Sequence, residues 1–316
     1  MISVEKLKNI KEVFYHESCP DGTASAMICR VALGPDVEFH SIQYGTEFMK
    51  KIEPREGQLF VDITPPISRW EEWKNFSPIV LDHHETSRHV TEGLGGVYGL
   101  NETHSGAMLA FDCVLSVVFN NPTTSRPLDI LLEWKEFAEL AMIRDTWKKD
   151  NPKWRDACAQ AMALQFHGSK KLINLVGTDD FAFGDLKFLG ASLLEQAERK
   201  TKLVAKTAYM KSIQTKKGEL KVSFFNCTEK IISDVANLLL EEGSDISIGY
   251  FHIFEDGLLK IQVSIRTHEK VAANVIAKYY GGGGHERAAG FSLKLNEAPT
   301  PDQLSEKIID AVNMTP

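Results

Sequence analysis

Short apolar runs bounded by polar residues recur along the first third of the chain. Four of them are rich in β-branched and aromatic residues, as strands are, and they span residues 12–15, 37–42, 58–63 and 78–81. Between the first two, residues 23–33 keep apolar positions at helical spacing and end at Gly34-Pro35, which predicts a helix. Strands that alternate with helices are typical of an α/β fold with a largely parallel sheet.

The middle of the chain has a different pattern. From about residue 104 to 209, apolar residues recur at three- and four-residue spacing, which predicts a helical layer. The longest apolar stretch, 107–119, is too short to span a bilayer and contains Asp112, so we expect a buried helix and no membrane partner. Residues 195–221 carry eight basic and three acidic side chains, which favours a solvated connector helix over a phosphate-attracting surface.

A strand pattern returns after this connector. Residues 220–227, 246–254 and 258–266 are strand-like, and the last two flank a Glu255-Asp256-Gly257 turn in a hairpin pattern. A helix over 269–280, four glycines and a strand over 290–295 follow. This second block is long enough to form its own α/β domain.

Length and composition narrow the class of protein. The 316 residues are about twice the usual domain size, and 43% hydrophobic and 25% charged residues are typical of a soluble globular protein. The net charge of −7 argues against a protein that coats long nucleic acid, although a small anionic substrate stays open. Five scattered cysteines without a CxxC pair, and an N-terminus unlike a secretory signal, predict reduced thiols and a cytoplasmic protein.

Residues that commonly bind metals collect where three of the predicted strands end. The segments VFYHESCPDGTASA, LFVDITPP and PIVLDHHETS place there His16, Cys19 and Asp21, then Asp62, then Asp82, His83 and His84. Ligands of open α/β sheets bind at the carboxyl ends of the strands, so we expect the three clusters to meet. An isolated strand-end aspartate would be ordinary, but a carboxylate that precedes two histidines can fix the tautomer of a ligating imidazole.

The chemistry of this set indicates the kind of metal. A ligand set of carboxylates and imidazoles is more typical of Mn²⁺ or another borderline divalent ion than of a thiolate-rich structural zinc site. Several shared carboxylates indicate a two-metal centre, with ions about 3.5 to 4 Å apart that activate a water for in-line attack on phosphorus.

At these spacings the segments HESCPDGTASA, FVDIT and LDHHE resemble the motifs of the DHH phosphoesterase superfamily, and GGGGHERAAGF resembles the glycine-rich signature of its DHHA1 partner domain. The resemblance brackets most of the chain, and the helical middle matches weakly. It implies a DHH catalytic domain over 1–190, a helical connector over 191–212 and a DHHA1 substrate-binding domain over 213–316, with the active site in the cleft between the domains. It also implies a Mn²⁺-dependent phosphodiesterase or phosphatase with two ions.

The resemblance further implies roles for individual residues. His16 and Asp21 match first-motif ligands, Asp62 the carboxylate that bridges both ions, and His83 a ligand of the second ion. Asp82 would support these ligands, and His84 would face the phosphate. A later aspartate of the family is best matched by Asp145 in AMIRDTW, which would otherwise be interpreted as a surface charge at a helix end.

Cys19 marks a departure from the family pattern. The first motif usually carries two acids two residues apart, whereas only Asp21 is present here. Cys19 replaces the first acid in one register and Thr23 the second acid in the other, and the Asp-Gly step before a small-residue helix favours the first register. Cys19 is then a thiolate ligand, a thiol that leaves one ion under-coordinated, or a packing cysteine.

The glycine run of the second block, 281–284, is either a flexible linker or a phosphate-binding loop. Its place between a helix and a strand favours the loop, because glycine amides can surround a phosphate while a neighbouring histidine donates to it. By the resemblance, the substrate-binding set is Gly282, Gly283, Gly284 and His285, with Arg266 at the end of a neighbouring strand. Arg287 belongs to this set or only covers the loop.

With the resemblance, these observations favour hydrolysis of short or single-stranded RNA or DNA, above all an RNA of a few nucleotides, to mononucleotides. The family also leaves open a RecJ-like single-strand exonuclease, a cyclic-dinucleotide phosphodiesterase and a bisphosphonucleoside phosphatase. A different class, a non-catalytic nucleotide-binding module, would follow if the missing acid had left a degenerate metal site. The oligomeric state stays open, with a homodimer as one alternative. Ser105, at a predicted helix start, is interpreted as an N-cap, because no base is patterned beside it as it would be for a nucleophile.

Overall fold

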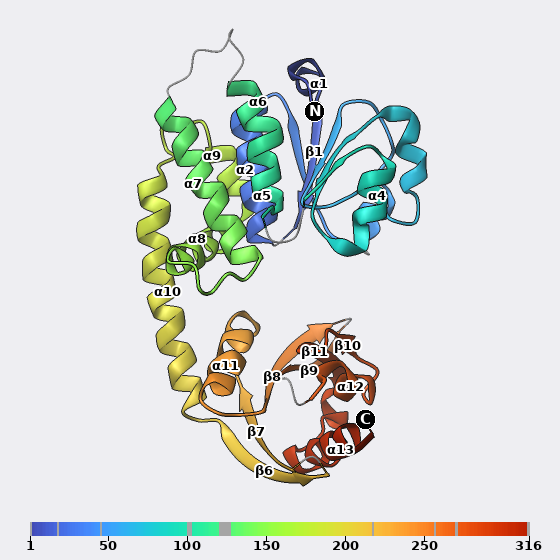
Figure 1. The fold of residues 1–316 in the computed structure, drawn as a ribbon, viewed down its shortest axis with the longest axis vertical. Helices are drawn as coiled ribbons and strands as arrows, with labels where there is room; N and C mark the ends of the chain where they lie inside the picture. Colours follow the sequence, from blue (N-terminus) through green and yellow to red (C-terminus); the bar gives the residue numbers. More distant parts are fainter. Residues whose placement is uncertain are drawn as a thin grey trace. The chain divides into compact units, whose positions relative to one another are not determined.

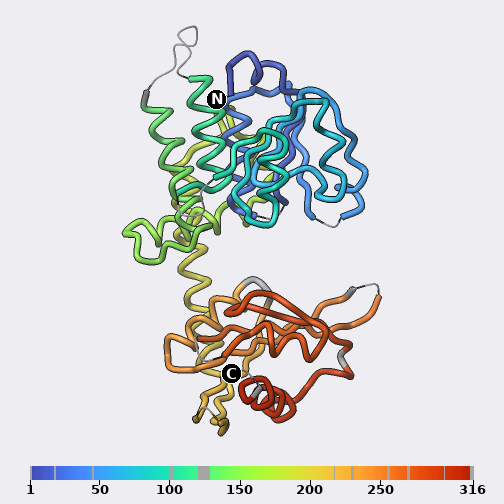
Figure 2. The backbone as a smooth tube through the Cα atoms, turned by 45° about the vertical axis from the view of Figure 1, so that its right-hand side comes forward, coloured from blue at the N-terminus to red at the C-terminus, as the bar shows by residue number. Residues whose placement is uncertain are grey.

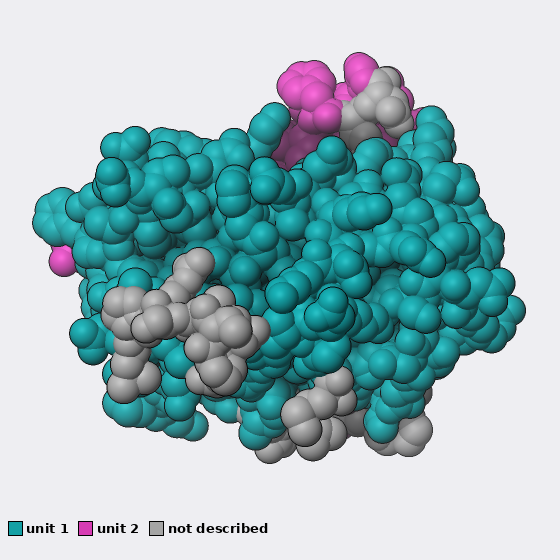
Figure 3. Space-filling model, turned by 90° about the horizontal axis from the view of Figure 1, so that it is seen from above, with its two compact units in different colours: residues 1–194 teal, residues 195–316 magenta. Residues whose placement is uncertain are grey.

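The computed structural model describes residues 2–17, 19–44, 46–99, 103–119, 128–216, 218–255, 257–268 and 271–314. The chain divides into two compact units, residues 1–194 and 195–316, which Figure 3 colours separately. Each unit contains one sheet covered by helices, so the α/β class expected from the sequence is confirmed. No helix within the described ranges is long and apolar enough to cross a membrane.

The first unit is built on a five-stranded sheet of order β2-β1-β3-β4-β5 in which neighbouring strands pair in parallel (Figure 1). Its strands are β1 Glu12–His16, β2 Glu38–Ile42, β3 Gln58–Val61, β4 Ile79–Asp82 and β5 Val97–Tyr98. The first four are the predicted strands. Because they run parallel, the residues that follow β1, β3 and β4 meet at one edge of the sheet.

Alternate side chains of these strands pack on opposite faces of the sheet. Val13 and Tyr15 of β1 join the larger core with α2 and α5, whereas Phe14 joins the smaller core around Trp73.

The stretch predicted to be a buried helix is α5, a π-helical turn and α6 in direct succession. The helices of this unit are α1 Val4–Lys8, α2 Pro20–Leu33, α3 Glu47–Lys50, η1 Trp70–Phe76, η2 Glu85–Ser87, α4 Arg88–Gly93, α5 Gly106–Ala110, the π-helical turn Phe111–Leu115, α6 Ser116–Phe119, α7 Leu128–Asp145, α8 Trp154–His167, α9 Ser169–Leu175 and α10 Phe183–Ala205, which runs into the second unit.

The second unit holds a mixed six-stranded sheet of order β10-β11-β9-β8-β7-β6. β7 and β8 pair in parallel and the other neighbours are antiparallel; β8 and β9 form the long hairpin visible in Figure 2. The elements are β6 Tyr209–Thr215, β7 Gly218–Asn226, α11 Glu229–Glu241, β8 Ile246–Glu255, β9 Leu258–Thr267, α12 Ala273–Lys278, β10 Gly283–Gly284, β11 Ala288–Lys294, η4 Leu295–Glu297 and α13 Pro301–Met314. One core lies under α12 and α13, and another lies under α11.

The end of the helical connector differs from the expectation. The helical connector was expected to reach residue 212, but α10 ends at Ala205 and β6 begins at Tyr209, because residues 209–215 pair with β7 along their whole length. The glycine run is not a linker, since Gly283 and Gly284 form β10 and pair with β11. Glu269, the expected start of a helix, and Asp256, in the expected hairpin turn, lie outside the described residues.

Candidate metal centre

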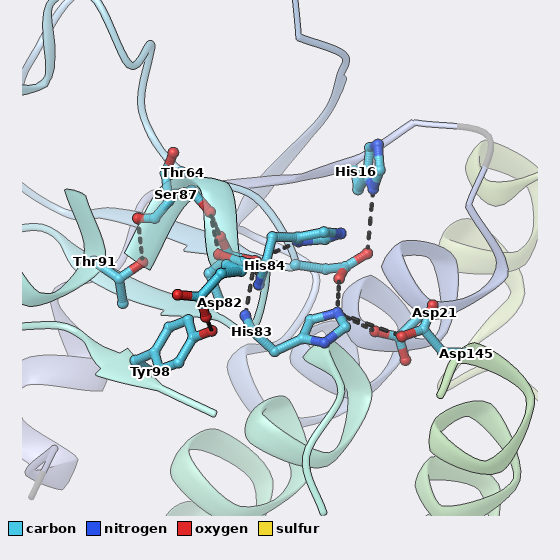
Figure 4. A network of polar contacts seen from close by, with 12 residues as sticks. His16, Asp21, Thr64, Asp82, His83, His84, Ser87, Thr91, Tyr98 and Asp145 are labelled. Carbon is cyan, nitrogen blue, oxygen red and sulfur yellow. Dashed lines mark hydrogen bonds and ion pairs between the residues drawn. The ribbon is translucent and has the colours of Figure 1, made fainter. Parts of the chain in front are cut away.

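The carboxyl ends of β1, β3 and β4 bring the predicted metal-binding side chains together. His16 is the last residue of β1, Asp62 follows β3, and His83 follows β4. Asp21 lies in the first turn of α2 and Asp145 is the last residue of α7. Figure 4 shows His16, Asp21, His83 and Asp145 turned toward a common centre.

Asp62 lies between two histidines. Its Oδ1 is 3.1 Å from His83 Nε2, and its Oδ2 is 3.5 Å from His16 Nδ1. The residue is buried and has a φ of 59°, a left-handed conformation that is uncommon for residues other than glycine. Backbone strain of this kind is frequent at functional sites, where the surrounding structure holds it. Each carboxylate oxygen of Asp62 therefore faces a different imidazole.

Two more carboxylates reach His83 from the helical side of the sheet. Its Nε2 is 4.0 Å from Asp21 Oδ2 and 3.5 Å from Asp145 Oδ2. Asp21 can come this close because Gly22 follows it: a Cβ at Gly22 would lie 2.4 Å from His16 O. The Asp-Gly step of the first motif thus allows close packing of Asp21 against the end of β1.

The unpaired atoms of this cluster fit divalent cations. His16 Nδ1, Asp62 Oδ2 and Asp21 Oδ2 are buried and have no hydrogen-bond partner among the described residues. Two sets of three side chains each offer ligand atoms within 4.8 Å of one another: His16, Asp62 and His84, and Asp21, Asp62 and His83. Buried acceptors without partners are costly, and a cation would satisfy them. Asp62 belongs to both sets, which is the arrangement expected of a bridging carboxylate.

A second hydrogen-bond network holds His84. Asp82 Oδ1 is 2.7 Å from His84 Nδ1 and accepts from the His83 backbone N–H at 2.9 Å. Asp82 Oδ2 accepts a short hydrogen bond from the Ser87 hydroxyl. Asp82 is fully buried, so its carboxylate fixes the His84 ring through Nδ1 and leaves Nε2 as the free ring nitrogen.

The charges of the cluster are strongly coupled. Burial raises the pKa of Asp21 well above its ordinary value, and the Asp62 and Asp145 carboxylates raise it further. Burial also opposes ionisation of Asp62, but its contacts with His16 and His83 and the positive charge of the neighbouring histidines hold its pKa below the ordinary value. Burial lowers the pKa of His83, yet the nearby carboxylates outweigh it and raise the value to about 9. In the metal-free protein a proton on His83 therefore offsets part of the negative charge.

Cys19 lies at the backbone N-cap of α2, and its side chain makes no cap hydrogen bond. It does not belong to either three-residue set of the centre, although Asp62 and Asp21 are close enough to affect its ionisation. Burial, followed by those two negative charges, raises the pKa of the thiol well above its ordinary value. The metal-free site therefore keeps Cys19 as a thiol.

Two serines have roles that only the structure shows: Ser105, which the sequence predicted to cap its own helix, and Ser87, which the sequence did not single out. Ser105 is the backbone N-cap of α5, but its hydroxyl does not cap the helix and instead donates to Asp21 Oδ1 at 2.6 Å. Ser87 donates to Asp82, as described above. Serines occur throughout the chain, and only the tertiary structure distinguishes these two.

In the second unit, the glycines are explained first by packing. A Cβ at Gly282 would lie 2.2 Å from Gly290 O, and Gly284 has a φ of 135°. The Gly282 N–H donates to Ala277 O, so this amide is already used. His285 and Arg287 are exposed in the turn between β10 and β11.

Arg266 lies near the end of β9, opposite Ala288 of β11. Its guanidinium donates to Ser264 Oγ at 3.1 Å, to Ile265 O at 3.0 Å and to Ser233 Oγ of α11 at 2.9 Å. The side chain is half-buried and ties α11 to the sheet. Arg266 therefore has a structural role in the second unit, whether or not it also binds substrate.

Comparisons with known proteins agree on one family. A family model described as the DHHA1 domain matches residues 217–314. Oligoribonuclease NrnB of Bacillus subtilis (strain 168) is 24% identical over 303 residues, an alignment that spans 88% of this chain and 72% of that protein.

Solved structures share the fold over nearly the whole chain. A pGpG-specific phosphodiesterase, PggH from Vibrio cholerae, aligns with a TM-score of 0.58 and 16% identity, covering 96% of this chain and 98% of that one. An exopolyphosphatase-related protein from Bacteroides fragilis aligns with a TM-score of 0.53 and 14% identity, covering 98% and 93%. At these identities the likeness shows the fold alone.

Proposed function

Since this chain belongs to the DHH/DHHA1 phosphoesterase superfamily and is a metal-dependent phosphoesterase, we propose that it hydrolyses short oligonucleotides to mononucleotides with Mn²⁺ as its cofactor. We further propose a cytoplasmic location, because the five cysteines are scattered and are expected to be reduced thiols, as is typical of cytosolic proteins.

One observation carries the proposal: the two oxygens of Asp62 face two different imidazoles. Asp62 would then help to hold both ions. Asp21, His83 and Asp145 would hold the second ion with it, and His16 would hold the first, with Cys19 beside it. Imidazole ligands favour Mn²⁺ over Mg²⁺. When bound, two such ions supply Lewis-acid polarisation of a phosphoryl oxygen and a water activated for attack on phosphorus.

The other site residues act on the substrate. Asp82 holds His84 through Nδ1, so that Nε2 is available to contact a phosphoryl oxygen and stabilise the charge that develops there. In the DHHA1 domain, Arg266 and His285 bind a neighbouring phosphate. Gly282, Gly283 and Gly284 shape the loop that precedes His285, and Arg287 covers it.

The preference for short substrates is supported by the relatives and by charge. NrnB is an oligoribonuclease, and PggH is specific for pGpG, a dinucleotide. The net charge of −7 provides no overall attraction to a long polyanion. A RecJ-like single-strand exonuclease, a cyclic-dinucleotide phosphodiesterase and a bisphosphonucleoside phosphatase are the alternatives that an assay must separate.

The test is a substrate panel with the Mn²⁺-loaded protein: labelled pGpG, RNA of about two to five nucleotides, RNA and DNA of twenty or more, a cyclic dinucleotide and a bisphosphonucleoside. We expect the shortest RNA to be cleaved fastest per mole of ends, because a site that aligns the substrate through a neighbouring nucleotide gains nothing from a longer strand. Chelation should abolish activity, and Mn²⁺ should restore it better than Mg²⁺ does.

The control for contaminating nucleases is Asp62→Asn, prepared in parallel. Loss of the Asp62 carboxylate should lower activity by more than the roughly 10- to 100-fold that is typical when a residue that only supports a metal ligand is replaced. Near-normal turnover by Asp62→Asn, or full activity in excess chelator, would contradict the metal centre. Processive degradation of long strands with slow cleavage of dinucleotides would instead favour the RecJ-like alternative.

A further inference from the structure

Asp21 makes two kinds of contact through its two carboxylate oxygens. Oδ1 accepts from the Ser105 hydroxyl at 2.6 Å and from the Ala107 backbone N–H at 3.2 Å. Oδ2 is buried, has no hydrogen-bond partner and lies 4.0 Å from His83 Nε2. The donors on Oδ1 both come from the start of α5, which is remote from Asp21 in the sequence. They leave Oδ2 as the oxygen that is free to coordinate.

Within the described residues, the Ser105 hydroxyl makes no hydrogen bond other than the one to Asp21. Ser105 is fully buried at the N-cap of α5, the usual place for a serine that caps its own helix. Its side chain makes no cap hydrogen bond, and the helix uses only its carbonyl, which accepts from Leu109 N at 3.0 Å. Its hydroxyl therefore bonds to the Asp21 side chain instead of to its own helix.

The backbone beside Ser105 is pressed against the same carboxylates. A Cβ at Gly106 would lie 2.4 Å from Asp62 Cβ and 2.9 Å from Asp21 Oδ2. Gly106 does not have a positive φ, so the glycine is required for space. This contact fixes the distance between the start of α5 and the two aspartates, and it places Ser105 Oγ within reach of Oδ1.

We propose that Ser105 is a positioning residue, whose hydroxyl holds Asp21 Oδ1 so that Oδ2 faces the ligand atoms of Asp62 and His83. The inference rests on the proposed function only in taking Asp21 as a metal ligand. Without the hydroxyl, the Asp21 side chain can rotate, and part of the metal-binding free energy must go into restoring its orientation. Partners of this kind typically change metal affinity by about 10- to 100-fold.

The experiment is calorimetric titration of the full-length, chelator-treated protein with MnCl₂. The variants are Ser105→Ala, Ser105→Cys and the matched control Ser25→Ala. Ser25 is also buried, and its hydroxyl also donates to Asp21. The acceptor is the backbone oxygen of Asp21, at 2.8 Å, and not its carboxylate. Cysteine keeps the shape of Ser105 but is a weak donor.

We expect Ser105→Ala to weaken one Mn²⁺-binding step by about 10- to 100-fold, Ser105→Cys to weaken it less, and Ser25→Ala to leave it unchanged. The melting temperatures of the metal-free Ser105→Ala and Ser25→Ala proteins should be similar, and excess Mn²⁺ should restore kcat in Ser105→Ala. Wild-type Mn²⁺ affinity in both Ser105 variants, or an equal loss in Ser25→Ala, would overturn the proposal. Calorimetry needs no substrate, so a failed hydrolysis assay counts against the proposed function alone.

Discussion

At the scale of single residues, substitution of Cys19 tests whether this residue takes part in metal binding. If it occupies the position of the missing acid, Cys19→Asp should preserve or raise the affinity for Mn²⁺, because a carboxyl group gives up its proton to a metal more readily than a thiol whose pKa burial and nearby carboxylates raise. Cys19→Ala should lower the affinity. Calorimetry of the three proteins checks this, and equal binding by all three would assign Cys19 to packing.

Arg266 has a structural role in the second unit and, in our proposal, also binds substrate; substitution can separate the two roles. Arg266→Ala should lower kcat/KM by roughly 10- to 100-fold, since a hydrogen bond to a charged group contributes about 1.5 to 3 kcal/mol. Mn²⁺ content should stay unchanged. The control is Ser233→Ala, which removes one anchor of the guanidinium but keeps its charge.

Ser233→Ala is expected to have a slightly lower melting temperature and a kcat/KM close to wild type. An equal loss of kcat/KM in both variants would show that Arg266 acts by holding α11 to β9. Loss of bound Mn²⁺ in Arg266→Ala would contradict the substrate-binding role.

At the scale of elements, the start of α5 is packed against the metal centre. Gly106→Ala should lower both the Mn²⁺ affinity and the melting temperature, because the added methyl overlaps Asp62 and overpacking of this kind costs about 1–3 kcal/mol. Gly184→Ala in α10 is the control: nothing lies within 4 Å of its Cβ position, and alanine favours helices. Thermal unfolding with and without Mn²⁺ measures both effects. A Gly106→Ala protein that binds Mn²⁺ like wild type would show that α5 can shift without disturbing the site.

At the scale of the whole molecule, rising pH should lower the stability of the metal-free protein and raise its affinity for Mn²⁺. Neighbouring carboxylates, against the effect of burial, raise the pKa of His83 from 6.5 to about 9. The stability that protonated His83 contributes is fully present below pH 6.5 and is lost as pH rises through about 9. Mn²⁺ competes with that proton, so its affinity should rise over the same interval.

Thermal unfolding across this interval, in chelator and in Mn²⁺, provides the measurement. The increase in melting temperature caused by Mn²⁺ should grow with pH, and His83→Gln should lose most of the pH dependence seen in chelator. A metal-free wild-type protein whose stability rises toward pH 9 would contradict the assignment of the proton to His83.

The sequence by itself determined the α/β class and four strands of the first sheet, because apolar periodicity reports which face of each strand is buried. It also identified residues that share the metal centre, including His16, Asp62 and His83, since parallel strands must end at a common edge. The resemblance to a family added Asp145, which no local pattern distinguishes from a surface charge. Four strands of the second sheet were predicted; β6, whose basic residues suggested a helix, and β10, in the glycine run, were not.

Only the tertiary structure decided how these side chains are oriented. The left-handed backbone of Asp62, the missing cap bond of Ser105 and the close approach of Gly22 and Gly106 to the carboxylates depend on contacts between segments far apart in the chain. A sequence records which donors and acceptors exist. Which acceptor a buried hydroxyl bonds to, and which carboxylate oxygen is left free for a cation, is settled only when the helices pack on the sheet, because burial removes the water that would otherwise satisfy every one of them.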